Sequence, residues 1–188
     1  MTDPVGTREP LIQTVSGRRI NPFAPDPAAI DIGDIAHALA NQCRFGGHCR
    51  RFYSVAQHSC VVADLAAGRR ADARGVLWAL LHDAAEAYLG DLPHPVKHNS
   101  ELGRIYRDAE DALQAAILQR FDLPPTPPPV VAGIDRAVLA AERRALMVPA
   151  WDWPELAGVA AAEVTIDPWS PEQAVREFLE RYDRLAGA

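Results

Sequence analysis

Prolines divide this chain into segments whose apolar residues are spaced as in helices. They cluster at Pro22–Pro27, Pro93–Pro95 and Pro124–Pro129. Because proline lacks a backbone N–H and clashes with the preceding helical turn, each cluster is expected to interrupt regular helix. Between the clusters, apolar residues recur every three to four positions, which predicts helices that bury one face. The sequence therefore predicts an all-α fold.

Capping residues and glycines mark the ends of the predicted helices. Ser54 is a plausible N-cap, with Gln57 three residues later as in a capping box. Gly68 and Gly90 each follow an apolar stripe and are expected to end a helix. The predicted helices cover about residues 31–43, 54–67, 72–89, 100–121, 130–147 and 171–185, and an exposed glycine-containing loop is predicted over residues 44–51.

Three segments fall outside this pattern. The run Ile12–Ile20 has a Ser-Gly pair between two β-prone stretches, which predicts a small hairpin. Residues 91–98 are not expected to form regular helix because they contain two prolines. The three tryptophans of Trp151–Trp169 are expected to pack that segment onto the body. With no internal repeat visible, we predict a single domain over residues 1–188, with its core at about 31–147.

Composition excludes several classes of protein. The formal net charge of −6 argues against a general nucleic-acid binder, which normally carries a basic face. No uninterrupted apolar stretch is long enough to predict a membrane span, and the N-terminus lacks the apolar region of a signal peptide. The 3 cysteines fit no zinc or redox motif. We therefore expect a cytoplasmic protein with reduced thiols.

Ionisable side chains interrupt the apolar stripe of the predicted helix 72–89. His82 and Asp83 are adjacent there, and Glu86 follows within one turn on the same side. Three such groups beside a core are costly unless they are compensated, and a divalent cation is the simplest compensation. A His-Asp pair taken alone could instead cap or bond nearby backbone.

Two further residues strengthen the metal interpretation. His58 lies on the preceding predicted helix, and Asp135 lies early in a later one, each flanked by apolar positions. Four ligand-type residues from three helices are typical of one inward-facing metal site.

The order His58, His82-Asp83, Asp135 resembles the signature of the HD-domain metal-dependent phosphohydrolase superfamily, which implies an HD-domain helical bundle. The run His82–Lys97 is similar to the corresponding segment of the bacterial 5′-deoxynucleotidase branch and of phage dATP triphosphohydrolases. The resemblance covers about residues 31–145. It implies that His58, His82, Asp83 and Asp135 are metal ligands.

The same resemblance implies roles for five other residues. Glu86 and Asp91 match acidic residues near the metal and the scissile phosphate, and are expected to be catalytic. Substrate-binding roles are implied for Arg44, Phe45 and Lys97, and the charge of Arg51 makes it a further candidate to bind the phosphate. Phe45 departs from the family, because the 5′-nucleotidases carry tryptophan there.

The implied reaction is hydrolysis at the 5′ phosphate of a deoxynucleotide by a water activated on one divalent ion (Mn, Co, Fe, Ni or Zn). Both a nucleoside monophosphatase and a triphosphohydrolase fit, and a triphosphate could bring additional Mg. A phosphodiesterase acting on another small nucleotide stays open, as does a catalytically inactive metal- or nucleotide-binding sensor or scaffold. The resemblance also implies a homo-oligomer.

Overall fold

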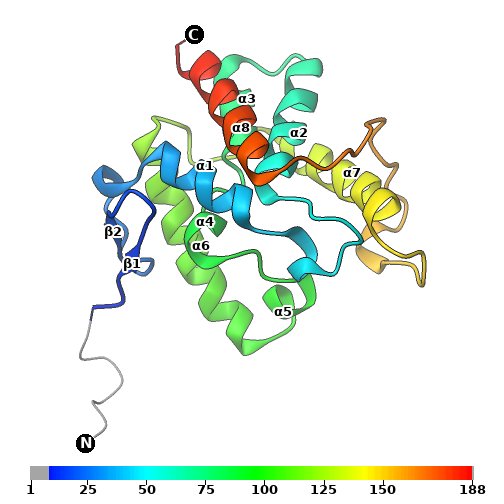
Figure 1. Ribbon diagram of the computed structural model, residues 1–188, viewed down its shortest axis with the longest axis horizontal. Helices are drawn as coiled ribbons and strands as arrows, with labels where there is room; N and C mark the ends of the chain where they lie inside the picture. The colour runs from blue at the N-terminus through cyan, green and yellow to red at the C-terminus, as the bar shows by residue number, and fades with distance from the viewer. Residues whose placement is uncertain (1–8, 188) are drawn as a thin grey trace, which may run out of the picture.

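Helices form in each of the six regions where the apolar spacing predicts them (Figure 1). The computed structural model describes residues 9–187. The expectation that the N-terminus is not a signal peptide concerns a segment that lies mostly outside these residues. The elements are β1 (Ile12–Gln13), β2 (Arg19–Ile20), η1 (Pro27–Ala29), α1 (Ile32–Asn41), η2 (Arg44–Gly47), α2 (Val55–Gly68), α3 (Ala73–Leu80), α4 (Glu86–Leu89), α5 (His94–His98), α6 (Glu101–Arg120), α7 (Pro129–Leu146), η3 (Pro154–Leu156) and α8 (Pro171–Ala186). The predicted all-α bundle with a small N-terminal β-hairpin is confirmed.

The hairpin is held against the first helix by a carboxylate. β1 pairs antiparallel with β2, with Ile12 opposite Ile20. Both the backbone N–H and the hydroxyl of Ser16 donate to Asp34, at 2.9 and 2.7 Å. Because Asp34 lies in the first turn of α1, these bonds fix the hairpin to the start of the bundle.

The core forms around α2, which packs against α1, α3, α7 and α8. α8 lies across α1, α2 and α3 on one face of the molecule (Figure 1). The largest fully buried side chains are Tyr53, Phe178, Ile20, Ile30, Ile35, Leu39, Leu80, Leu81, Leu113, Ile117, Ile134 and Leu146. Within residues 9–187, no helix is both long enough and apolar enough to cross a membrane.

The N-terminus of α2 also holds the segment that precedes α8. The Ser54 hydroxyl accepts from the N–H of Gln57 at 3.1 Å, which confirms the predicted N-cap. The Gln57 side chain turns away from the cap. Its amide donates to the carbonyl of Asp167 at 2.8 Å, and its oxygen accepts from the N–H of Trp169 at 2.9 Å. A side chain expected to cap a helix therefore joins two distant parts of the chain.

Two of the three tryptophans of this segment pack as expected. Trp169 lies against the main core, and the ring of Trp153 meets Phe45 edge-on at 6.0 Å between centroids. Trp151 is 66% exposed and is therefore not an anchor.

The predicted continuous helix over residues 72–89 is wrong, because the chain leaves α-helical geometry between Leu80 and Glu86. Backbone bonds there span three residues rather than four, as where the N–H of Ala84 donates to the carbonyl three positions earlier. The sequence has neither glycine nor proline at this point. The tight turns contain His82–Asp83, and they bring His82 against α2 and α7 and Asp83 against α2.

The expectation for residues 91–98 is also wrong, since α5 forms there despite the two prolines. Pro93 precedes the helix and Pro95 lies in its first turn, where a missing N–H costs no helical hydrogen bond. α5 packs against α6, and Gly103 of α6 lies against the main-chain carbonyl of Lys97. A Cβ at Gly103 would overlap that carbonyl, so a glycine is needed for the close approach.

Candidate metal centre

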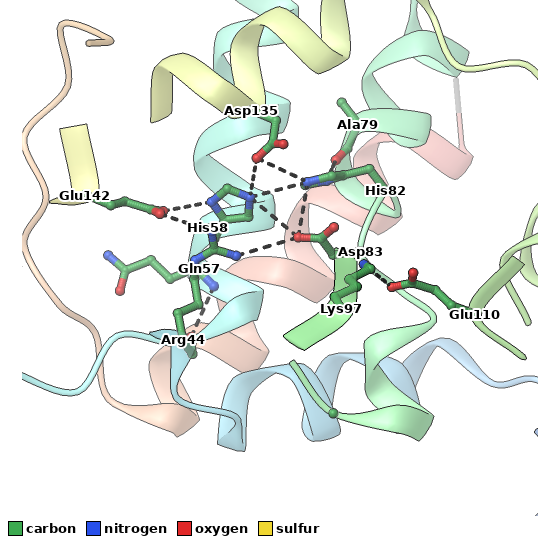
Figure 2. A network of polar contacts seen from close by, with 12 residues as sticks. Arg44, Gln57, His58, Ala79, His82, Asp83, Lys97, Glu110, Asp135 and Glu142 are labelled. Atoms are coloured by element: carbon green, nitrogen blue, oxygen red, sulfur yellow. Dashed lines mark hydrogen bonds and ion pairs between the residues drawn. The ribbon is translucent and has the colours of Figure 1, made fainter. Parts of the chain in front are cut away.

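Four side chains that carry metal-ligand atoms converge inside the bundle (Figure 2). His58 comes from α2, His82 and Asp83 from the turns after α3, and Asp135 from α7. The Nε2 atom of His58 lies 3.3 Å from Nε2 of His82 and 3.5 Å from Oδ2 of Asp83. Oδ1 of Asp135 lies 3.1 Å from the first of these nitrogens and 3.9 Å from the second. Ligand atoms of His58, His82 and Asp83 all lie within 4.8 Å of one another, close enough for one cation to contact them all.

Contacts on the far side of each imidazole determine how the rings face the centre. Nδ1 of His82 lies 2.8 Å from the carbonyl oxygen of Ala79, which can only accept, so this nitrogen carries a proton. Nδ1 of His58 lies 2.7 Å from a carboxylate oxygen of Glu142. Burial raises the pKa of Glu142, but Arg44 and His58 outweigh burial and lower it, so the carboxylate accepts. Both Nε2 atoms are therefore left to face the centre, as in metal-bound histidines.

This donor set fits a divalent cation. Two neutral imidazoles oriented in this way direct two Nε2 lone pairs at each other and at two carboxylate oxygens. Such a group is unfavourable in a buried place unless positive charge compensates it. Imidazole and carboxylate together suit Mn, Fe, Co, Ni or Zn. His58 is fully buried, so the cost of leaving it uncompensated is high.

Protons can supply the same compensation, and the charges around His58 favour this. Burial and the charge of Arg44 lower the pKa of His58, but Glu142 and Asp135 outweigh them and raise it to about 10. Burial also lowers the pKa of His82, and Asp83 outweighs it, so that pKa is raised as well. Metal and proton therefore compete for the same nitrogen atoms.

This competition predicts a pH-dependent metal affinity. Below its raised pKa, His58 carries a proton that a cation must displace, so affinity should increase as pH increases. One displaced proton corresponds to about a tenfold gain per pH unit, and two to about a hundredfold. Titrating the protein with Mn²⁺ between pH 6 and 8 by calorimetry, in buffers of different ionisation enthalpy, measures both the affinity and the protons released. An affinity that does not change over this range would contradict the assignment.

Glu86 lies beside the cluster and is almost completely buried, with 6% of its surface exposed. Burial, followed by the charges of Asp83 and Asp91, raises the pKa of Glu86 well above its usual value. Its Oε2 atom has no hydrogen-bond partner within residues 9–187. A buried, unpartnered carboxyl of this kind can hold or accept a proton next to a bound substrate. Asp91 follows Gly90, which has a φ of 83°, and is half-buried.

Arg44 and Glu142 are buried residues that contact the cluster of four ligands. The guanidinium of Arg44 is buried, at 3.2 Å from Glu142 and 3.7 Å from Asp83. The sequence resemblance predicts Arg44 as a substrate ligand, but it does not identify Glu142. A signal for Glu142 existed, because it lies two helical turns after Asp135 and interrupts the apolar stripe of α7.

The other residues expected to bind substrate have their polar and ring contacts with residues other than the four ligands. Lys97 donates to Glu110 at 2.6 Å. Burial lowers the pKa of Lys97, but Glu110 and the nearby charges of Glu86 and Asp83 outweigh burial and raise it. Arg51 is exposed and pairs with Asp167 at 3.6 Å. Phe45 has a left-handed φ of 60° and packs its ring against Trp153 and a small cluster around Tyr53. Their roles in substrate binding stay predictions, and Lys97 would have to share its charge with Glu110.

Comparison with known proteins gives a family match and three relatives. A family model described as "5′-deoxynucleotidase YfbR-like" matches residues 40–126, a range that contains His58, His82, Asp83 and Glu86. The uncharacterized protein YfdR of Escherichia coli (strain K12) is 37% identical over 178 residues, which are 94% of this chain and 96% of that protein.

Two further relatives are similar over shorter stretches. The uncharacterized protein RCAP_rcc00048 of Rhodobacter capsulatus is 41% identical over 154 residues, 79% of this chain and 74% of that protein. The 5′-deoxynucleotidase VV1113 of Vibrio vulnificus is 30% identical over 114 residues, 59% of this chain and 45% of that protein.

Proposed function

The chain belongs to the YfbR-like 5′-deoxynucleotidase family of HD-domain proteins, and from this premise we propose that it is a metal-dependent phosphohydrolase acting on the 5′ phosphate of deoxynucleotides. The observation that carries the proposal is the convergence of His58, His82, Asp83 and Asp135 next to the buried carboxyl of Glu86. The description of the family favours a nucleoside monophosphate as substrate. A triphosphate is the second form of the same proposal.

The four converging side chains would hold the cation. When bound, a divalent ion lowers the pKa of water and polarises a phosphoryl oxygen. Asp83 is held for this role in its ionised form: burial raises its pKa, but His82 and His58 outweigh burial and lower it. The neighbouring Arg44 keeps positive charge at the same centre.

Glu86 would move the proton in this reaction. Burial and the charges of Asp83 and Asp91 raise the pKa of Glu86 well above its usual value, so this carboxyl group can hold a proton at a higher pH than an ordinary one. Asp91 would be a second acceptor, placed where its charge acts on Glu86 and Arg44. The guanidinium of Arg44 is the cation nearest to the cluster and would contact the phosphate through its fork of N–H groups.

A substrate panel tests the proposal. The metal-stripped protein is incubated with the dNMPs and dNTPs, each with Mn²⁺, Co²⁺ or Mg²⁺, and free phosphate and triphosphate are measured separately. Release of phosphate from a dNMP identifies the monophosphatase, and release of triphosphate from a dNTP the triphosphohydrolase. Addition of EDTA should abolish either activity. If no nucleotide is hydrolysed with any metal, the proposal fails; nucleotide binding without turnover would then favour an inactive sensor.

A further inference from the structure

Glu142 carries a carboxylate that is completely buried, and burying a charged group is costly. It lies in the last third of α7 with none of its surface exposed. At such a position, an apolar residue of similar volume often gives a protein that is equally or more stable. Stability of the helix packing is therefore a weak reason for a glutamate at this position. Its contacts give a better one.

The two oxygens of Glu142 contact two different elements of the site (Figure 2). Oε1 accepts from Nδ1 of His58, on α2, at 2.7 Å. Oε2 lies 3.2 Å from a terminal nitrogen of Arg44, which belongs to the loop between α1 and α2. The first contact keeps the proton of His58 on the side away from the metal centre. The second contact holds the guanidinium beside Asp83, at 3.7 Å.

On the premise of the proposed function, we infer that Glu142 is a positioning residue that joins the metal centre to the phosphate-binding arginine. Through His58 it directs one Nε2 atom at the cation. Through Arg44 it directs a positive fork toward Asp83, on the side of the cluster where a phosphate bound to the cation could be contacted. One rigid carboxylate thus sets the distance between the two groups that would hold the substrate, so its loss should weaken both metal and phosphate binding.

Four variants separate this role from a merely structural one. Glu142→Leu removes both contacts, while Glu142→Gln keeps one acceptor oxygen and loses the negative charge. Arg44→Lys keeps a positive charge but loses the fork. Glu177→Gln is the matched control, because Glu177 also forms an ion pair, with Arg181 at 2.8 Å on α8, away from the cluster. Circular dichroism and thermal melting establish that each variant is folded.

Two titrations give the readouts, and neither depends on turnover. Mn²⁺ is titrated into the metal-stripped protein by calorimetry. Inorganic phosphate is then titrated into the Mn²⁺-loaded protein, and its binding is followed by the broadening of the ³¹P signal. We expect Glu142→Leu to weaken Mn²⁺ binding by about 10–100-fold, the usual effect of losing a partner of a metal-bound histidine. Glu142→Gln should lie between this variant and the wild type, and Glu177→Gln should match the wild type.

Phosphate binding tests the connection to Arg44. Arg44→Lys and Glu142→Gln should each weaken phosphate binding by about tenfold, comparable to the loss of one charge-assisted hydrogen bond. The double variant should be no weaker than the weaker single variant, because both changes remove the same oriented fork. Arg44→Lys should leave Mn²⁺ affinity within about threefold of the wild type, since it keeps the charge.

Wild-type affinity for both probes in folded Glu142 variants would overturn the inference, as would fully additive effects on phosphate binding. If Glu142→Leu does not fold, Glu142→Gln decides the question alone. The result is also separable from the proposed function. A protein that hydrolyses no nucleotide can still show, or fail to show, the predicted losses in Mn²⁺ and phosphate binding.

Discussion

Replacing His82 with alanine is expected to abolish Mn²⁺ binding and to lower nucleotide hydrolysis by about a thousandfold or more. Nε2 of His82 lies at the centre of the cluster, at 3.3 Å from His58 and 3.2 Å from Asp83. A bound cation supplies several kcal/mol of transition-state stabilisation. A change of about 1.4 kcal/mol in the activation free energy changes the rate tenfold. Loss of the ligand should therefore remove most of the catalysis.

The measurement combines calorimetric Mn²⁺ titration with turnover of the best substrate from the panel. His37→Ala is the matched control, because His37 is exposed on α1 and is not one of the converging ligands. A folded His82→Ala protein that binds Mn²⁺ as tightly as the His37→Ala protein would exclude His82 as a ligand. Measured turnover in that variant without bound metal would exclude the metal mechanism as a whole.

Replacing Glu86 with glutamine should lower the turnover number by about 10²–10⁴-fold while metal affinity stays near that of the wild type, as is usual for loss of a general acid or base. The amide has the shape of the carboxyl group but cannot exchange a proton. Glu86 is buried and its pKa is raised well above its usual value by burial and by Asp83 and Asp91, so removing its charge relieves repulsion rather than adding it. The folded state should therefore tolerate the substitution.

Steady-state kinetics over a range of pH separate this role from binding. In the wild type, the pH profile of the turnover number should contain a limb from Glu86, displaced upward from the usual range of a carboxyl group, and this limb should be absent in the variant. Glu101→Gln, an exposed site in the first turn of α6, provides the control. An unchanged turnover number in Glu86→Gln would exclude Glu86 as the proton-transferring residue, and Asp91 would then be the candidate for this role.

Most of the helices could be predicted from the sequence because their signals are local. Ser54 caps α2 as predicted, and the apolar spacing placed α6 and α7 within a few residues of their observed ends. The break after Leu80 could not be predicted in this way. The segment has no helix-breaking residue, and its tight turns are accompanied by a bond from the imidazole of His82 to the backbone. The break coincides with the contacts of His82 with His58 on α2 and Asp135 on α7, and these residues are distant in the sequence.

For the candidate site, too, some features could be predicted from the sequence and others could not. The sequence alone determined which residue types could bind a metal and that His58, the pair His82–Asp83 and Asp135 come from three separate segments, because ligand chemistry and helix periodicity are properties of the chain. Only the tertiary structure decided what each charge faces. Glu142 is paired with both His58 and Arg44, whereas Lys97, which the sequence suggested for phosphate, is paired with Glu110. The physical reason is that a buried charge must be compensated by a neighbour in space, and that neighbour can lie anywhere in the sequence.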